Sequence, residues 1–228
     1  MSQVACFLIE PTSRVRQTLR RYTRGERWDE AAKCYIYDNP CPLTSGVLRS
    51  HDTETLIEDA PVVADTREGY EGYLRNGSCG EVERYADDPR WPTHCACGYP
   101  FTNEDTRQVF CEEIYRRADT GEEYTLRDAP AGAMWYAPWV AHFFRPQLPG
   151  GPLVVKLPDG TDWQVDSMAN NCTMKDDWKQ ERHHCWVIEG TPPLVSVGKS
   201  GSTCGAGAGS IATSRYHGFL RNGMLESC

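Results

Sequence analysis

Two cysteines one residue apart, Cys95 and Cys97, lie in the stretch WPTHCACGYPF at Trp91–Phe101. Zinc sites usually take their ligands in pairs from one turn, with about two to four residues between them. The single intervening residue requires a tighter turn, which Gly98 permits because glycine adopts backbone conformations that other residues avoid. We expect Cys95 and Cys97 to form half of a structural zinc site, with His94 as an alternative ligand beside Cys97. Packed thiols and a redox or disulfide role are the competing interpretations.

The other ligands of such a site must come from elsewhere in the chain, and the sequence offers two sources. The nearest cysteines on either side are Cys79 and Cys111. A second cluster beyond residue 170 contains Cys172, His183, His184, Cys185, Cys204 and His217. Its spacing matches no zinc finger, so three interpretations remain: a second zinc, a zinc shared with the Cys95 pair, or ordinary buried thiols. A shared zinc would join the middle of the chain to its C-terminal region.

The N-terminal sequence indicates the redox environment that we expect for the cysteines. The chain has 228 residues, of which eleven are cysteines. Its first residues show neither the charged region nor the cleavage site of a secretory signal. No apolar run reaches the ~18 residues that a membrane span requires. We therefore expect no membrane association and a reducing cytosol, where cysteines are metal ligands or thiols rather than disulfides.

Charge indicates which partners the chain can bind. The formal net charge is −8, which disfavours general binding to nucleic acid because neutralising phosphates requires a surplus of lysine and arginine. One basic stretch, SRVRQTLRRYTRGER, carries six arginines between Arg14 and Arg27. It is predicted as a helix that starts after Pro11 and ends at Gly25, with a solvated basic face. The alternative is a docking patch for an acidic partner or for nucleic acid.

Most other elements are predicted as strands, because their apolar residues form short runs or alternate with polar ones. Turn residues at Pro158–Gly160 and Thr120–Gly121 predict two hairpins. The aromatic stretch at 129–144 is expected to form a loop or short helix over the core. The strands are expected near residues 4–9, 32–38, 60–65, 107–117, 153–166, 185–190 and 194–198.

These elements predict a β-rich α+β fold with antiparallel strands and a few short helices, stapled by cysteine and histidine. The proline- and glycine-rich segment at 146–152 is the best linker candidate in the chain. It would separate an N-terminal and cysteine-rich region, 1–148, from a C-terminal β-rich region, 149–228. One continuous domain is the alternative.

A glycine run near the C-terminus is the main candidate for binding a cofactor. Gly205, Gly207 and Gly209 would let the backbone approach an anion or nucleotide closely, as phosphate-binding loops do. The spacing is neither G-x-G-x-x-G nor that of a P-loop. A tight structural loop is therefore the competing interpretation.

A hydrolytic triad is the main candidate for catalysis. Ser210 and His217 would supply the nucleophile and the base, with Asp166 or Glu189 as the carboxylate. The G-x-S-x-G motif that exposes a nucleophilic serine at a sharp turn is absent. The residues therefore indicate a reaction only if the fold brings them together.

Four segments carry a family resemblance: CGEVERYADDPRWPTHCACGYPF, TGEEYTLRDAPAGAMW, NNCT with HHCWVIEGTPPLVSV, and TCGAGAGSI with YHGFLRNG. Together, over about residues 78–223, they resemble a family of uncharacterised cysteine-rich proteins encoded by tailed bacteriophages and prophages. The resemblance implies a phage gene product in the host cytoplasm or assembled into the virion.

The resemblance and the residues together lead to two functional hypotheses. The first is a non-enzymatic, zinc-stabilised protein that binds a phage or host protein, as a minor virion component, an accessory factor or a host-takeover factor. The alternative is a hydrolase or nucleotide-processing enzyme that uses the Gly205–Ser210 loop and His217.

Overall fold

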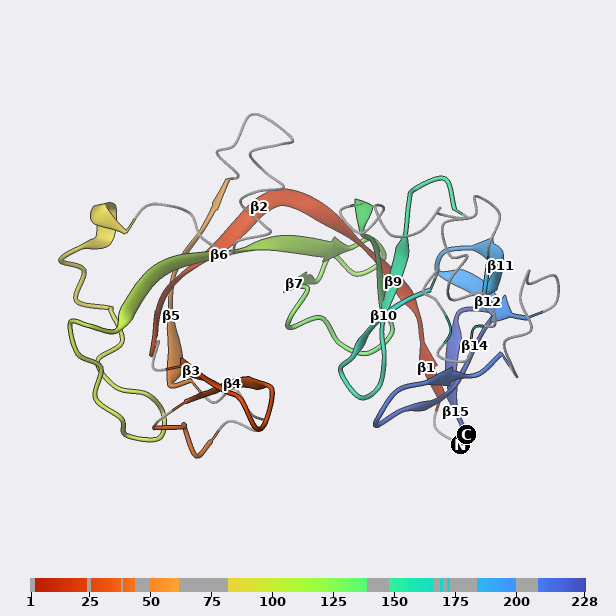
Figure 1. The fold of residues 1–228 in the computed structure, drawn as a ribbon. Coiled ribbons are helices and arrows are strands. Elements are labelled where there is room, and N and C mark those ends of the chain that lie inside the picture. The colour runs from red at the N-terminus through yellow and green to blue at the C-terminus, as the bar shows by residue number, and fades with distance from the viewer. Residues whose placement is uncertain are drawn as a thin grey trace. The chain divides into compact units, whose positions relative to one another are not determined.

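The structure, a computed structural model, describes residues 3–23, 26–37, 39–43, 50–61, 82–138, 148–165, 169, 172, 184–199 and 209–228. The chain divides into two units, Met1–Thr12 with Tyr115–Cys228 as unit 1, and Ser13–Ile114 as unit 2. The strands β2 (Phe7–Tyr22) and β6 (Thr106–Arg117) are neighbours and belong in part to each unit (Figure 1). These units do not coincide with the ranges 1–148 and 149–228 that the sequence suggests.

The described residues are rich in antiparallel strands, as the sequence predicts, but they contain no α-helix. The one helical element among them is a short 3-10 turn, η1 (Glu83–Tyr85). The expectation of a few short helices is therefore not met in this part of the chain. No helix in it has the length and apolar character needed to cross a membrane.

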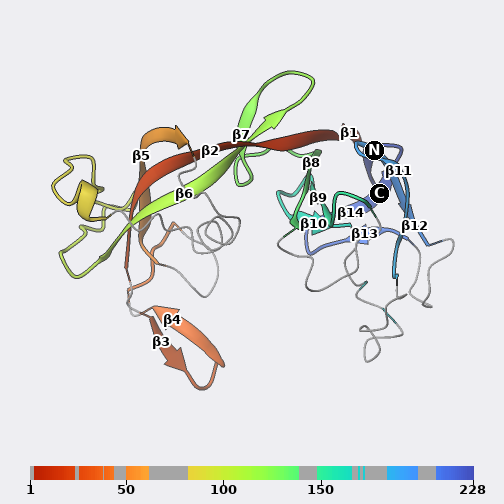
Figure 2. The same ribbon diagram turned by 90° about the horizontal axis from the view of Figure 1, so that it is seen from above.

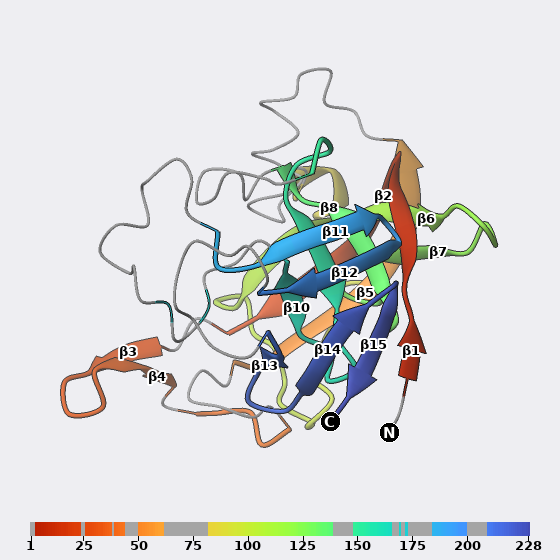
Figure 3. The same cartoon turned by 90° about the vertical axis from the view of Figure 1, so that its right-hand side faces the viewer.

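Unit 1 is built from short strands in two sheets and a hairpin. Its strands besides β2 and β6 are β1 (Gln3–Ala5), β7 (Glu123–Thr125), β8 (Ala133–Tyr136), β9 (Leu153–Lys156), β10 (Asp162–Gln164), β11 (Val187–Thr191), β12 (Leu194–Gly198), β13 (Ile211–Ala212), β14 (His217–Arg221) and β15 (Met224–Ser227). One sheet has the order β1-β15-β14-β13, which places the N-terminal strand beside the C-terminal one (Figure 3). The predicted hairpin at Pro158–Gly160 is confirmed as β9–β10, and β11 pairs with β12.

The core of unit 1 is aliphatic and aromatic. Strand β9 is buried along its whole length, and Leu153 and Val155 are 0% exposed. Strand β8 lies between β9 and β2, so its backbone is paired on both sides. The prediction of a loop or short helix at 129–144 is wrong for β8, since a segment flanked by two strands completes its hydrogen bonds as a strand.

Unit 2 is organised around the C-terminal part of β2, which pairs antiparallel with β5 (Asp52–Pro61). The register shifts between Gln17 and Thr18, where the pairing forms an irregularity of the β-bulge kind. A separate hairpin joins β3 (Glu26–Asp29) to β4 (Cys34–Tyr37). In Figure 2 this hairpin stands apart from β2, β5 and β6.

The arginine-rich stretch forms most of β2, so the prediction of a helix over it is wrong. Val15 and Leu19 are buried on one face, while Arg14, Arg16 and Arg20 lie on the alternate positions. Arg14 and Arg16 pair with Asp59 on β5 at 3.6 and 3.3 Å. Arg20 pairs with Asp52 and Glu54, also on β5. The acidic strand therefore offsets much of the positive charge that suggested a docking patch.

Candidate metal centre

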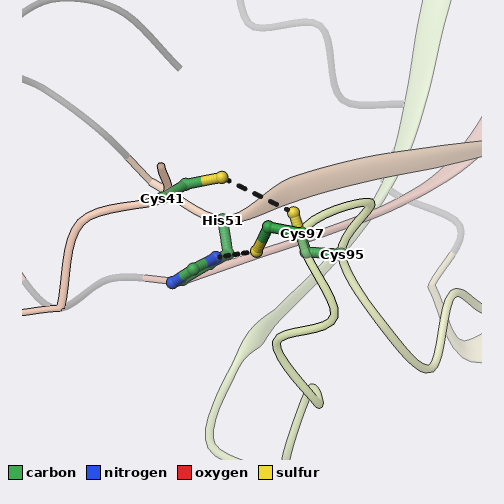
Figure 4. Close-up of side chains that lie close together, drawn as sticks. All are labelled: Cys41, His51, Cys95 and Cys97. Carbon is green, nitrogen blue, oxygen red and sulfur yellow. Dashed lines mark hydrogen bonds between the residues drawn. The ribbon is translucent and has the colours of Figure 1, made fainter. Parts of the chain in front are cut away.

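Four side chains of unit 2, from Cys41, His51, Cys95 and Cys97, form one compact cluster (Figure 4). Their ligand atoms all lie within 4.8 Å of one another. Cys41 follows β4, His51 immediately precedes β5, and the two other cysteines belong to the turn before β6. Three of the four are buried and Cys97 is half-buried. Within the described ranges this is the single group of cysteine, histidine and acidic residues with such geometry.

The turn that carries Cys95 and Cys97 is narrow and closed by backbone hydrogen bonds. The N–H of Gly98 donates to the Cys95 carbonyl at 2.8 Å, and the N–H of Cys95 donates to the Tyr99 carbonyl at 2.8 Å. Gly98 has a φ of +91°, in the left-handed region that favours glycine. A turn followed by one left-handed residue is a common three-residue hairpin loop. The expected tight turn at Gly98 is confirmed, and it directs both sulfurs into the cluster.

His51 presents one ring nitrogen to the cluster and uses the other to fix its orientation. Its Nε2 lies 3.1 Å from the Asn39 carbonyl oxygen, and its Nδ1 lies 3.2 Å from the Cys97 sulfur. Because a carbonyl only accepts, Nε2 carries the proton and the Nδ1 lone pair faces the cysteines. This is the arrangement of a metal-binding histidine, whose second nitrogen donates to a carbonyl or carboxylate.

Neighbouring side chains hold both ligand-bearing segments in place. The His51 ring stacks on Tyr99, with centroids 3.9 Å apart and planes 8° from parallel. The backbone N–H of His51 donates to the Thr23 hydroxyl at 3.1 Å. Arg21, on β2, donates to the carbonyls of Pro92 and Thr102, on either side of the turn. The turn and the histidine are therefore anchored to the same strand pair, β2 and β5.

The cluster favours a thiolate at one cysteine and disfavours a second. Burial raises the pKa of Cys95, but hydrogen bonds to its sulfur, the largest of them from the Cys97 N–H, outweigh burial and lower the pKa to about 6. For Cys97, the Tyr99 N–H lowers the pKa, while burial and the sulfurs of Cys95 and Cys41 raise it above its ordinary value. Accumulated negative charge limits ionisation in such a cluster. A cation among the sulfurs removes that limit, since metal ligation deprotonates a thiol outright.

The spacing of the ligand atoms fits a tetrahedral ion. With Zn–S bonds of about 2.3 Å, the sulfurs of a tetrahedral site lie about 3.8 Å apart. The sulfurs of Cys41 and Cys95 are 3.9 Å apart. These four residues therefore lie close enough to one another to hold a metal ion.

The structure separates the ligands predicted near the turn. Cys95 and Cys97 belong to the cluster, whereas His94 is exposed and its Nδ1 contacts the Thr93 hydroxyl at 3.1 Å. Cys111 is disulfide-bonded, which corrects the expectation that its thiol completes the site and that disulfides are absent. Cys79 and Cys204 lie outside the described residues.

The predicted second cluster does not form a metal group within the described residues. Cys172 and Cys185 are reduced and buried, and both pack against the apolar core of unit 1. The four residues of the metal cluster come from unit 2 alone, so a zinc shared with Cys172 or Cys185 is not what the structure assembles. His184 is half-buried, and His183 lies outside the described residues. In an apolar core a cysteine acts as a small hydrophobic residue.

The structure brings together two residues of the predicted hydrolytic triad. The Ser210 hydroxyl lies 3.1 Å from Nε2 of His217, on the surface at the β13–β14 pair. Among the described residues no carboxylate contacts His217, and Glu189 lies exposed on β11. Asp166 is outside them. A serine–histidine contact alone lacks the third group that orients the base in a triad.

The glycine run is described only at its end. Gly209 has a φ of +74° and leads into Ser210 and β13, which fits a structural role in a turn. Gly205 and Gly207 lie outside the described residues. Anion or nucleotide binding by this loop therefore stays a prediction.

Neither Cys41 nor His51 is among the ligands that the sequence predicts, and only Cys41 carries a local signal. Cys41 lies between Pro40 and Pro42, a combination that predicts a turn and so a place where a ligand can be presented. His51, in RSHDTE, has no neighbour at a ligand spacing. Neither residue pairs with another ligand at a zinc-finger spacing, because each contributes singly.

Comparisons of the chain with family models, with curated proteins and with solved structures found no match. The functional conclusion therefore rests on the chemistry of the cluster and on the residues around it.

Proposed function

We propose that Cys41, His51, Cys95 and Cys97 bind one structural zinc ion, and that the protein acts by binding another protein rather than by catalysis. The observation that carries the zinc assignment is the convergence of three sulfurs and one oriented imidazole nitrogen within 4.8 Å. Tetrahedral sites with sulfur and nitrogen ligands are those that zinc occupies in proteins.

The ligand set supports a structural role for the ion. Catalytic zinc sites keep one position open for water or substrate, whereas structural sites are closed by four protein ligands. Here all four positions have a protein ligand, and Cys41 and His51 are 1% and 3% exposed. The zinc would join the loop after β4, the start of β5 and the turn before β6.

The β3–β4 hairpin supports the binding role. Trp28 and Tyr35 are directly opposite each other in the hairpin and are 49% and 51% exposed. Their rings form an edge-to-face pair with centroids 5.2 Å apart. Exposed tryptophan and tyrosine side chains are enriched in protein interfaces. The chain leads from β4 into the loop of Cys41, so the zinc would also fix one end of this hairpin.

The family resemblance supports the biological setting, a phage protein that is a minor virion component or an accessory factor for a phage or host protein. The test of the virion role is mass spectrometry of purified particles, in which the protein should be present at low copy number. Its absence from particles, with expression during infection, would leave the accessory role.

The zinc assignment is tested by elemental analysis of the purified full chain. We expect one equivalent of zinc, which is lost in the variant His51→Ala and retained in His94→Ala, its matched control outside the cluster. Retention of the full equivalent in His51→Ala, or zinc absent from the unaltered chain after purification with added zinc, would contradict the assignment.

A further inference from the structure

We propose that the metal centre is a reversible thiol switch, in which a peroxide oxidises Cys41 and Cys95 to a disulfide and the ion is released. The inference rests on the proposed zinc site and adds a modification of that site. The cluster combines the two properties that such a switch requires, a pair of adjacent sulfurs and a metal held by them.

All three sulfurs of the cluster lie within 4.8 Å of one another, and two of them are in direct contact. The sulfur of Cys41 contacts that of Cys95 at 3.9 Å, and the sulfur of Cys97 contacts Nδ1 of His51 at 3.2 Å (Figure 4). A disulfide bond is about 2.05 Å long, so Cys41 and Cys95 need to approach by roughly 2 Å. The Cys97 sulfur also faces an imidazole, which cannot form a disulfide. We therefore assign the disulfide to Cys41 and Cys95, whose sulfurs are in contact.

The access of a small oxidant is supported by the position of the turn. Ala96 and Gly98, which flank Cys97, are exposed, and Cys97 itself is half-buried. Cys41 and Cys95 are 1% and 6% exposed. We expect a small oxidant such as hydrogen peroxide to reach the cluster from the exposed turn more readily than a bulky one.

The reaction balances with hydrogen peroxide as the oxidant. The Cys95 sulfur attacks one peroxide oxygen, the O–O bond breaks, and the leaving hydroxide takes a proton to form water. The Cys41 sulfur then attacks the sulfur of the Cys95 sulfenic acid, forming the S–S bond and breaking the S–O bond. The second hydroxide also leaves as water. Two thiolates lose two electrons, the peroxide gains them, and the zinc ion leaves unchanged because it has no redox chemistry in proteins.

The product keeps one of the connections that the ion made. The disulfide joins Cys41 to Cys95, so the loop after β4 remains attached to the turn before β6. His51 and Cys97 lose their common ligand. A dithiol reductant such as dithiothreitol would reduce the disulfide, and added zinc would restore the site. The switch thus changes metal content without detaching the loop.

The experiment treats the zinc-loaded full chain with hydrogen peroxide and follows zinc release with a colorimetric indicator. We expect one equivalent released per chain, together with a peptide mass two hydrogens lower that links Cys41 to Cys95. Dithiothreitol and zinc should restore both. The matched control is Cys34→Ser, which removes the cysteine nearest to Cys41 in the sequence but leaves the cluster intact. It should behave as the unaltered chain does.

Two further arms make the result decisive. Cys97→Ser keeps the selected sulfur pair and should still form the Cys41–Cys95 link when its metal-free form is oxidised. Retained zinc under peroxide, a Cys95–Cys97 link, or irreversible sulfinic and sulfonic acids in place of a disulfide would overturn the inference while the proposed zinc function stands. A chain that binds no zinc but forms the Cys41–Cys95 link when oxidised would instead overturn the zinc function.

Discussion

The two units bury cysteines to similar extents, but the pKa of the buried thiol is shifted in opposite directions in the two units. Cys6 of unit 1 is 9% exposed, and Cys95 of unit 2 is 6% exposed. Burial raises the pKa of Cys6 from its ordinary 9.0 to about 12, although a hydrogen bond to the Leu225 backbone opposes the rise. The pKa of Cys95 is lowered to about 6, because hydrogen bonds from backbone N–H groups around its sulfur outweigh burial. The depth of burial therefore does not decide what a cysteine does.

The surroundings that separate these cysteines also differ in the side chains that pack around them. Unit 1 has an extended core of aliphatic and aromatic side chains, into which Cys6, Cys172 and Cys185 pack. The corresponding group around the metal centre consists of Cys41, Cys95 and Phe101, with Cys97 and Tyr99 against it. It contains no aliphatic side chain. A small apolar group stabilises a fold weakly, and a structural metal is a usual supplement.

The largest effect is expected when one buried cysteine of each unit is replaced by serine. Cys95→Ser should abolish zinc binding and the ordered structure around the turn, since zinc contributes on the order of 10 kcal/mol in structural sites. Cys185→Ser, in the core of unit 1, should cost about 1–3 kcal/mol for burying a hydroxyl and leave the zinc content unchanged. Elemental analysis and thermal unfolding measure both. Equal effects of the two substitutions would remove the distinction between the units.

The second expected effect is the ionisation of the metal-free protein. Thiolate absorbance should rise as the pH increases through about 6, because the pKa of Cys95 lies near that value. The rise should disappear in Cys95→Ser. Cys6→Ser should not change the titration below pH 9, since its thiol stays protonated there. A metal-free chain that shows no thiolate until pH 8 would mean that the N–H groups of the turn do not stabilise the anion.

The predictable parts of the fold are those determined by local pattern. The alternation in β6 and the turn residues at Pro158–Gly160 predict elements that the structure contains. The tight turn at Gly98 is predictable for the same reason. The helix predicted over the basic part of β2 is wrong, because the residues that oppose its arginines lie on β5, more than thirty residues away. Pairing at that separation leaves no trace in a short window of sequence.

Only two of the four residues of the candidate site were predictable from the sequence. Cys95 and Cys97 signal their role because they are close in sequence and precede a glycine. Cys41 and His51 join them from two other segments, 54 and 46 residues from the cysteines they contact. Several other cysteines and histidines were equally available as partners. Which of them complete the site depends on the pairing of β2 with β5, which brings His51 to the turn.

The third prediction tests the turn itself with a matched pair of glycines. Gly98 and Gly121 have φ values of +91° and +76°, and a Cβ on either would meet nothing within 4 Å. Gly98→Ala and Gly121→Ala should therefore each cost about 1–2 kcal/mol from backbone strain alone. Only Gly98→Ala should weaken zinc binding. The affinity for zinc should fall roughly tenfold for each 1.4 kcal/mol by which the strained turn destabilises the zinc-bound state. Competition with a chelator measures this, and equal affinities in the two variants would show that the turn is not constrained by the ion.

The smallest expected effect concerns the ion pairs between β2 and β5. Asp59→Asn removes the partner of Arg14 and Arg16 on β2. Both arginines remain partly exposed, so the loss should be below about 1 kcal/mol, as for other surface ion pairs. Glu123→Gln, which removes the 2.7 Å pair with Arg116 in unit 1, is the matched control and should cost as little. Denaturant unfolding measures both. A contradicting result would be a loss of several kcal/mol of stability in Asp59→Asn alone, together with weaker zinc binding. It would mean that the ion pairs between β2 and β5 are needed to place His51, and that they matter as much as the thiolates that hold the ion.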